Sequence, residues 1–206
     1  MTILPTDSLP ELLPPRGYVA PHEVAPADDP SRAAWEAACA LVSRAIDRAL
    51  AGQPSEAVAL LDEARASAMD ADASIRLMVA LNRAQALLES GDLAGADDEA
   101  AAALRLARRE RKDRWAALAG LGAALVHLAR GSRGDARTRL GEAVRLFARE
   151  GDALRQLQCH YLLGEIAYLA EDPIRAGSHY RDALGIARTA RAQAWIELLT
   201  LRFEHR

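Results

Sequence analysis

One short pattern returns four times along this chain of 206 residues and constrains its fold more than any other feature. Each copy has a Gly or Glu, a polar turn, and then an alanine that opens a helix. The copies read GQPSEA, GDLAGA, GSRGDA and EDPIRA, and they end at Ala57, Ala96, Ala136 and Ala176. The alanines follow one another at steps of 39, 40 and 40 residues. A period of this length is typical of stacked helical hairpins, so we predict an all-α chain.

The composition agrees with a helical core and argues against nucleic acid as a partner. Half of the residues are hydrophobic but only 4% are aromatic, so the core must consist mainly of Ala and Leu. The formal net charge is −3, which gives no excess of cations to displace counterions from a phosphate backbone. We therefore expect no nucleic acid as a partner.

The cysteines and the first residues bear on localisation. Cys39 and Cys159 form no spaced framework, which favours reduced thiols. The start MTILPTDSLP has neither a cationic nor an apolar leader region, and no apolar run approaches the ~20 residues of a membrane span. We expect a cytoplasmic protein with no membrane contact. The single lysine among many arginines suggests a GC-rich bacterial genome.

Residues 1–30 are predicted to form a proline-rich arm, because seven of the nine prolines fall there. Proline removes a backbone donor and biases the residue before it toward extended conformations. The arm also carries apolar residues that a purely solvated tail does not need, namely Leu9, Leu12, Leu13, Tyr18 and Val19. It is either a solvated leader or a segment that docks on the rest of the chain.

From Asp29-Pro30 onward, the apolar residues recur with helical spacing. Asp29 is a predicted N-cap, and Pro30 is suited to a first helical turn. The periodicity predicts nine helices, at about 31–51, 54–68, 72–90, 93–110, 113–130, 133–150, 153–170, 173–188 and 191–203.

The predicted turns contain residues that cap helices or allow left-handed backbone. The predicted N-caps are Asp92, Asp113, Ser132, Asp152 and Asp172. Gly52, Gly91 and Gly131 stand where a helix ends in the left-handed conformation, and Glu171 is the exception at that position.

The repeat resembles the tetratricopeptide repeat, best in the fourth copy, YLLGEIAYLAEDPIRAGSHYRDAL. That family requires small residues where two helices cross closely. Twelve such positions are all Ala or Gly here: Ala45, Ala84, Ala124 and Gly164 in the first helices, and Ala57, Ala64, Ala96, Ala103, Ala136, Ala143, Ala176 and Ala183 in the second. The step of about 40 residues exceeds the ~34 of ordinary repeats, as in kinesin-light-chain-like proteins and in sensor domains of bacterial transcription activators.

The resemblance implies a right-handed α-solenoid of four helical hairpins at 31–190, closed by a C-terminal capping helix at 191–206. Trp115 and Trp195 are 80 residues apart, two repeats, which supports the last helix as half of a fifth repeat.

In that family, the first helices line a concave groove, and its positions carry over residue by residue. They are Val42, Ile46, Met78, Leu81, Gln85, Leu118, Leu121, Leu125, Gln158, Tyr161 and Glu165. Most are apolar, and an apolar patch of this extent usually marks an interface. An amphipathic or extended segment of another protein, a second copy of this chain, or the arm itself could cover it. Tighter winding could instead bury these side chains against one another.

We find no residues arranged for catalysis, cofactor binding or metal binding. Cys159 and His160 are adjacent on a helix and point about 100° apart, so they cannot converge on one metal ion. His127 and His160 fall seven repeat positions apart, roughly 10 Å along the helix axes. We therefore expect a non-enzymatic scaffold or adaptor that binds a protein segment in the groove. The alternative is a regulatory or sensor module that binds a small ligand or an inhibitory partner.

Overall fold

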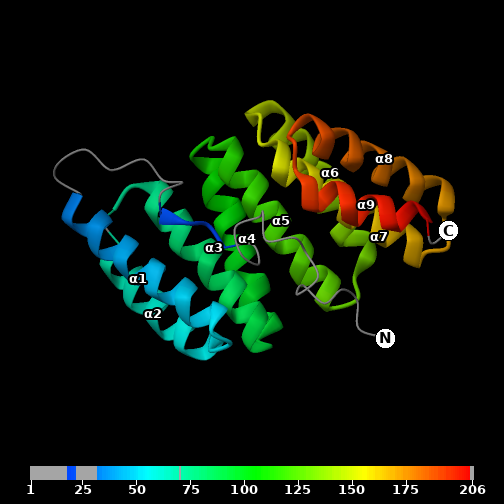
Figure 1. Cartoon of the computed structure of the whole chain (residues 1–206). Helices are drawn as coiled ribbons and strands as arrows, with labels where there is room; N and C mark the ends of the chain where they lie inside the picture. The colour runs from blue at the N-terminus through cyan, green and yellow to red at the C-terminus, as the bar shows by residue number, and fades with distance from the viewer. Residues whose placement is uncertain (1–17, 22–31, 70, 205–206) are drawn as a thin grey trace.

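The computed structural model describes residues 18–21, 32–69 and 71–204. Within these ranges the chain is all-α, with nine helices and no strand (Figure 1). The helices are α1 (Arg32–Leu50), α2 (Pro54–Ser67), α3 (Ala73–Ser90), α4 (Leu93–Arg109), α5 (Asp113–Ala129), α6 (Arg133–Glu150), α7 (Ala153–Leu169), α8 (Pro173–Thr189) and α9 (Gln193–Glu204). The predicted ranges agree with these bounds to within two residues at either end.

Three of the predicted N-caps make the expected hydrogen bond. Asp92, Asp152 and Asp172 accept from the backbone N–H three residues ahead, at 2.9, 3.2 and 3.0 Å. Each bond satisfies a donor that the first helical turn leaves without a partner. Asp29 and Pro30 lie outside the described residues.

The N-cap prediction was wrong for Asp113, and Ser132 stands at its predicted cap without making the expected hydrogen bond. Asp113 is the first residue of α5, after Lys112 at the cap, and its carboxylate pairs with Arg149 at 2.9 Å. Ser132 occupies the cap of α6, but its side chain makes no capping bond. Its backbone ψ is 65°, near the 76° of Asp92.

Glu171 has the left-handed backbone conformation although it is not a glycine. Its φ is +57°, in the left-handed region that the three glycines occupy at the corresponding turns. Arg111 and Arg191 have the same conformation, at +53° and +54°. This backbone costs a residue with a Cβ atom more than it costs glycine.

Each helix packs against the next one along the chain, from α1 to α9, in a repeat-like arrangement (Figure 1). In addition, α3 contacts both α1 and α5. All twelve small residues predicted at close crossings are buried, so the spacing of Ala and Gly identified real packing positions. At these positions a methyl group or a hydrogen lets helix axes come close.

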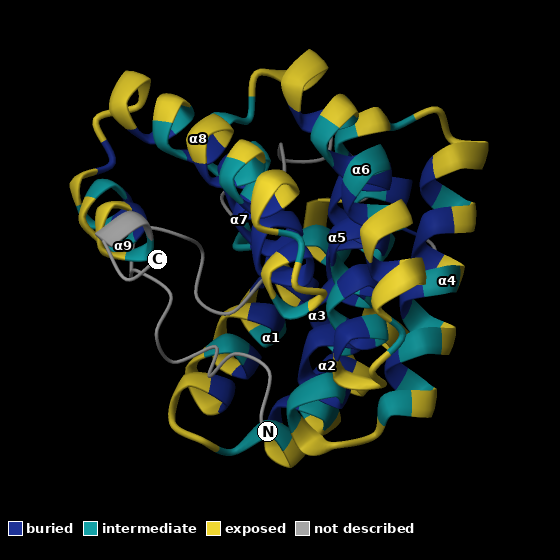
Figure 2. Ribbon diagram, turned by 90° about the vertical axis from the view of Figure 1, so that its right-hand side faces the viewer, coloured by how far each residue is buried: buried dark blue, intermediate teal, exposed yellow. Residues whose placement is uncertain are grey.

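The helices differ in how much of their surface is buried. Helices α3, α5 and α7 are buried over most of their circumference, whereas α4, α6 and α8 bury a narrower stripe of mainly Ala and Leu (Figure 2). The layer of α3, α5 and α7 therefore lies inside. Among the described residues, no helix is both long enough and apolar enough to cross a membrane.

Candidate functional site

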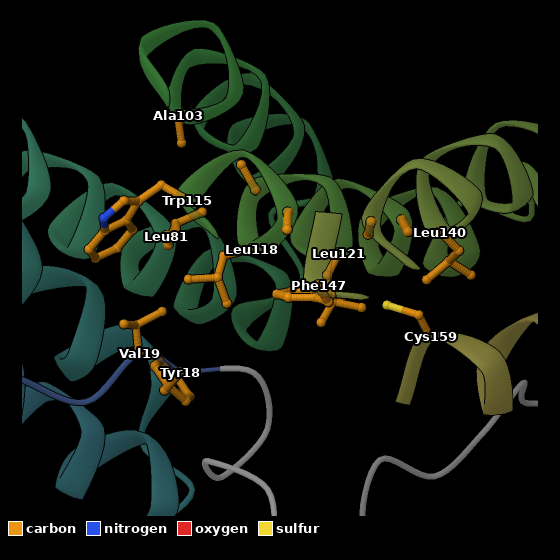
Figure 3. Packing of buried hydrophobic residues seen from close by; sticks show 14 of the residues in the cluster. Tyr18, Val19, Leu81, Ala103, Trp115, Leu118, Leu121, Leu140, Phe147 and Cys159 are labelled. Atoms are coloured by element: carbon orange, nitrogen blue, oxygen red, sulfur yellow. The ribbon is translucent and has the colours of Figure 1, made fainter. Parts of the chain in front are cut away.

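A short piece of the N-terminal arm lies against α3 and α5. Tyr18 and Val19 are both 1% exposed and belong to the main hydrophobic core. Figure 3 shows the two side chains beside Leu81 of α3 and Leu118 of α5. These two residues precede the first helix in the sequence, yet they are as well buried as the residues of the helical core.

Asn82 of α3 holds the backbone of Val19. The Val19 N–H donates to Asn82 Oδ1 at 2.7 Å, and Asn82 Nδ2 donates to the Val19 carbonyl at 2.9 Å. Asn82 is fully buried, so without these two bonds its amide would lack partners at a cost of roughly 1–3 kcal/mol. A primary amide offers one donor and one acceptor side by side, and it matches the N–H and C=O of an extended residue.

The phenol of Tyr18 is also bonded. Its hydroxyl donates to Glu89 Oε2 at 3.1 Å, and the other oxygen of Glu89 accepts from Gln85 Nε2 at 3.0 Å. Gln85, a predicted groove residue, therefore orients the Glu89 carboxylate that accepts the hydrogen bond from Tyr18. A polar end and an apolar body make Tyr suited to such a half-polar pocket.

The residues around Tyr18 and Val19 form a pocket that we call the arm pocket. It contains six of the eleven predicted groove residues: Leu81, Gln85, Leu118, Leu121, Leu125 and Gln158. The space left over is about 20 Å³, enough for about one water molecule. With Tyr18 and Val19 in place, little free volume remains in this part of the predicted groove.

The remaining predicted groove residues lie elsewhere. Val42 and Met78 are fully buried in the core, and Ile46 packs against it, on the side of α1 and α3. Tyr161 and Glu165 are buried beneath α9. The structure therefore does not bring all eleven residues into one surface.

Helix α9 covers Glu165 with a set of polar and aromatic contacts. Tyr180 donates a short hydrogen bond to Glu165, and Arg202 of α9 pairs with the other carboxylate oxygen at 3.0 Å. Arg202 also donates to the Tyr161 hydroxyl at 3.4 Å, and the ring of Tyr161 meets Trp195 edge-on at 5.4 Å between centroids. Burial, followed by the bond to Glu165, raises the pKa of Tyr180, so this hydroxyl stays a donor.

The sequence interpretation missed Asn82 and Arg155. Five polar or charged side chains are buried among the described residues, and all of them belong to α3 or α7: Asn82, Gln85, Arg155, Gln158 and Glu165. A signal was present, because Asn82 precedes Gln85 by three residues and therefore shares its helix face. Of these, Asn82 and Gln85 act on the arm residues, whereas Arg155 pairs with Asp152 and Glu165 is held by Tyr180 and Arg202.

The two cysteines carry no evident chemistry. Both are free and buried. Burial raises the pKa of each thiol, and the effect is larger for Cys159. Neither provides a thiolate at neutral pH, the form that acts as a nucleophile.

Comparisons with known proteins identify a neighbour in fold. No family model matches the chain. No curated protein matches it either. Among solved structures, the chain is similar to BtubC (BKLC) from P. vanneervenii, with a TM-score of 0.69 and 20% sequence identity. The match covers 78% of this chain but 66% of that one, and at this identity it shows a shared helical fold alone.

Proposed function

We propose that this chain is a non-enzymatic protein-interaction scaffold whose inner helices bind an extended protein segment. In this proposal the fold is a right-handed, tetratricopeptide-like solenoid of four hairpins, closed by α9. Its binding site is the arm pocket, and Tyr18 and Val19 stand in the place of a ligand.

The observation that carries the proposal is the pair of hydrogen bonds between Asn82 and Val19. They recognise the main chain of a segment and not its side chain, so any extended residue could make them. Affinity would come from these bonds and from apolar burial, while the pocket walls would select the neighbouring side chains.

The walls favour an aromatic residue followed by a β-branched one. The first position combines an apolar lining with the Glu89 carboxylate, which accepts from a phenol. The second is enclosed by leucines of α3 and α5, where a compact branched side chain fills the space with little loss of rotamer freedom.

The regulatory alternative, with a small ligand in the groove, has less support. While Tyr18 and Val19 are in place, the arm pocket retains only about 20 Å³. Pockets for small molecules usually measure several hundred Å³. A segment that replaces the arm residue for residue is the simpler occupant.

A peptide-display selection tests the proposal. The bait is the full-length chain with Tyr18→Ala and Val19→Ala, which removes the anchors of the arm and keeps every groove residue; circular dichroism checks that it remains helical. We expect selected peptides to carry an aromatic residue followed by Val or Ile. Adding Asn82→Ala should weaken their binding by roughly tenfold, as expected for two lost hydrogen bonds.

Ser90→Ala is the matched control, because Ser90 lies on the same helix and bonds only to the backbone of Leu87. It should leave peptide binding unchanged. Failure to enrich any sequence, or peptides that bind equally well without Asn82, would rule out recognition through this pocket.

A further inference from the structure

Two histidines and an aspartate meet where α7 packs against α8. His160 lies on α7, and His179 and Asp182 are three residues apart on α8, which places them on one face. One ligand atom from each lies within 4.8 Å of the others, and His160 Nδ1 is 3.7 Å from Asp182 Oδ2. The two imidazole rings are 5.7 Å apart between centroids.

Each of the two histidines has a buried ring nitrogen without a hydrogen-bond partner. Nδ1 of His160 and Nδ1 of His179 are both buried and form no hydrogen bond. Five buried side-chain nitrogens of the described residues share this condition, and two of the five are in this one cluster. Buried polar atoms in native proteins nearly always have a partner, so their coincidence here points to a missing ligand.

Burial disfavours the charged form of both imidazole rings. Burial lowers the pKa of His160 and of His179, although the nearby Asp182 carboxylate acts in the opposite direction. Arg175 further lowers the pKa of His179, and its own charge is paired with Asp172 at 3.3 Å. A neutral imidazole is the form that binds a metal ion.

The ligand set indicates a class of ion. Two imidazole nitrogens and one carboxylate suit first-row transition metals such as Zn²⁺, whereas Ca²⁺ and Mg²⁺ prefer oxygen ligands alone. Donors bound at about 2.0–2.2 Å around a tetrahedral ion lie roughly 3.3–3.6 Å apart. The separation between His160 and Asp182 is already close to this, and side-chain rotations that shorten the longest separation by roughly 1 Å would close the cluster around a metal.

The cluster is open on one side. His160 and Asp182 line a hollow with Gln156, Arg181 and Thr189, and the Asp182 side chain is 53% exposed. An ion held by three protein ligands would keep at least one coordination position toward this hollow, for water or an outside ligand.

We infer that His160, His179 and Asp182 form a binding site for a divalent first-row transition metal that joins α7 to α8. The site is separate from the arm pocket and does not depend on the proposed scaffold role. From the sequence we expected no metal ligands, because neither Cys159 nor His127 can share an ion with His160 and no repeat spacing links His160 to His179.

Titration of the untagged full-length chain with Zn²⁺ alone tests the site, after dialysis against a chelator. Calorimetry should give one ion per chain, and Zn²⁺ should raise the melting temperature. Asp182→Asn and His179→Gln should each weaken binding by roughly tenfold or more and abolish the thermal shift. Mg²⁺ should bind far more weakly. Co²⁺ as a substitute should give visible d–d absorption that each variant loses.

Asp182→Asn is the decisive variant, because its half-exposed side chain can change without disturbing the core. His127→Gln on α5 is the control for histidines outside the cluster and should bind like the wild type. Absence of a saturable Zn²⁺ site, or an affinity that Asp182→Asn and His179→Gln leave unchanged, overturns the inference.

Discussion

The ring of Tyr180 occupies the space where a side chain at Gly164 would begin. A Cβ atom placed on Gly164 would lie 2.5 Å from Cε1 and 2.7 Å from Cδ1 of Tyr180. Tyr180 is fully buried, and its hydroxyl is bonded to Glu165, so the ring cannot move aside. Helices α7 and α8 therefore cross closely at this point because residue 164 has no side chain.

Gly164→Ala should destabilise the chain by about 1–3 kcal/mol, since overpacking forces helix or ring out of position. Urea unfolding followed by circular dichroism measures the change. The control is Gly185→Ala on α8, where a Cβ atom would meet nothing within 4 Å. There the helix should gain about 0.5–1 kcal/mol from alanine, and equal effects at both sites would contradict the packing argument.

Asn82→Ala should release the arm. The Val19 N–H loses its acceptor, and its hydrogen exchange should accelerate by roughly tenfold or more, because buried donors keep protection only while bonded. Hydrogen exchange with mass spectrometry on the full-length chain reports this. Ser90→Ala should leave the exchange at Val19 unchanged. Protection of Val19 that persists without Asn82 would show that the apolar contacts of Tyr18 and Val19 suffice.

Arg202 and Glu165 should be energetically coupled. Arg202→Ala leaves a buried carboxylate without its cation, and we expect a loss of about 1–3 kcal/mol, moderated because Arg202 is 41% exposed. In a Glu165→Gln background the same change should cost clearly less. Urea unfolding of the four chains gives the coupling energy. Additive losses would mean that α9 is held by Trp195 and its other apolar contacts and not by the ion pair.

The N-cap of α3 should make stability depend on pH at the acidic end. Burial opposes ionisation of Asp72, but the N–H of Ser74 at 2.7 Å and the charge of Lys112 outweigh it and lower its pKa below 3.8. A carboxyl group whose pKa is lower in the folded than in the unfolded protein stabilises the fold fully at pH values above its unfolded-state pKa. This stabilisation is lost as the pH falls through the folded-state pKa.

We therefore expect Asp72→Ala to cost about 1 kcal/mol at neutral pH and progressively less below about pH 3.8. Unfolding curves of the two chains across the acidic range measure the difference. Ser132→Ala, at a cap that makes no side-chain bond, should show little loss at any pH. A cost of Asp72→Ala that stays constant down to pH 2 would assign the effect to helix propensity.

The helices could be predicted because every turn carries its own local signal. Gly, Pro or Asp stands at nearly every boundary, and Ala or Gly recurs at each close crossing, so a few residues determine each element. Asp113 was misplaced by one residue, a shift that spacing does not resolve, whereas Ser132 lies at its predicted cap without a side-chain bond.

The sites could be predicted less well because they join residues distant in sequence. Asn82 and Val19 are 63 residues apart, and no periodicity links an arm to a helix. His160 and His179 face each other only once the register of α7 against α8 is known. Position within a repeat grouped Leu81, Gln85 and Leu118, but it could not show that Tyr18 and Val19 lie against them.

In the proposed scaffold role, every outside segment would compete with a tethered rival, because Tyr18 and Val19 belong to the same chain as the arm pocket. A short tether presents such a rival at an effective concentration on the order of millimolar, whatever the dilution of the protein. The affinity that an outside segment displays is then lower than its intrinsic affinity by the fraction of time the pocket is vacant. Weak encounters would then be filtered out, and displacement of Tyr18 and Val19 would raise the affinity for all segments together.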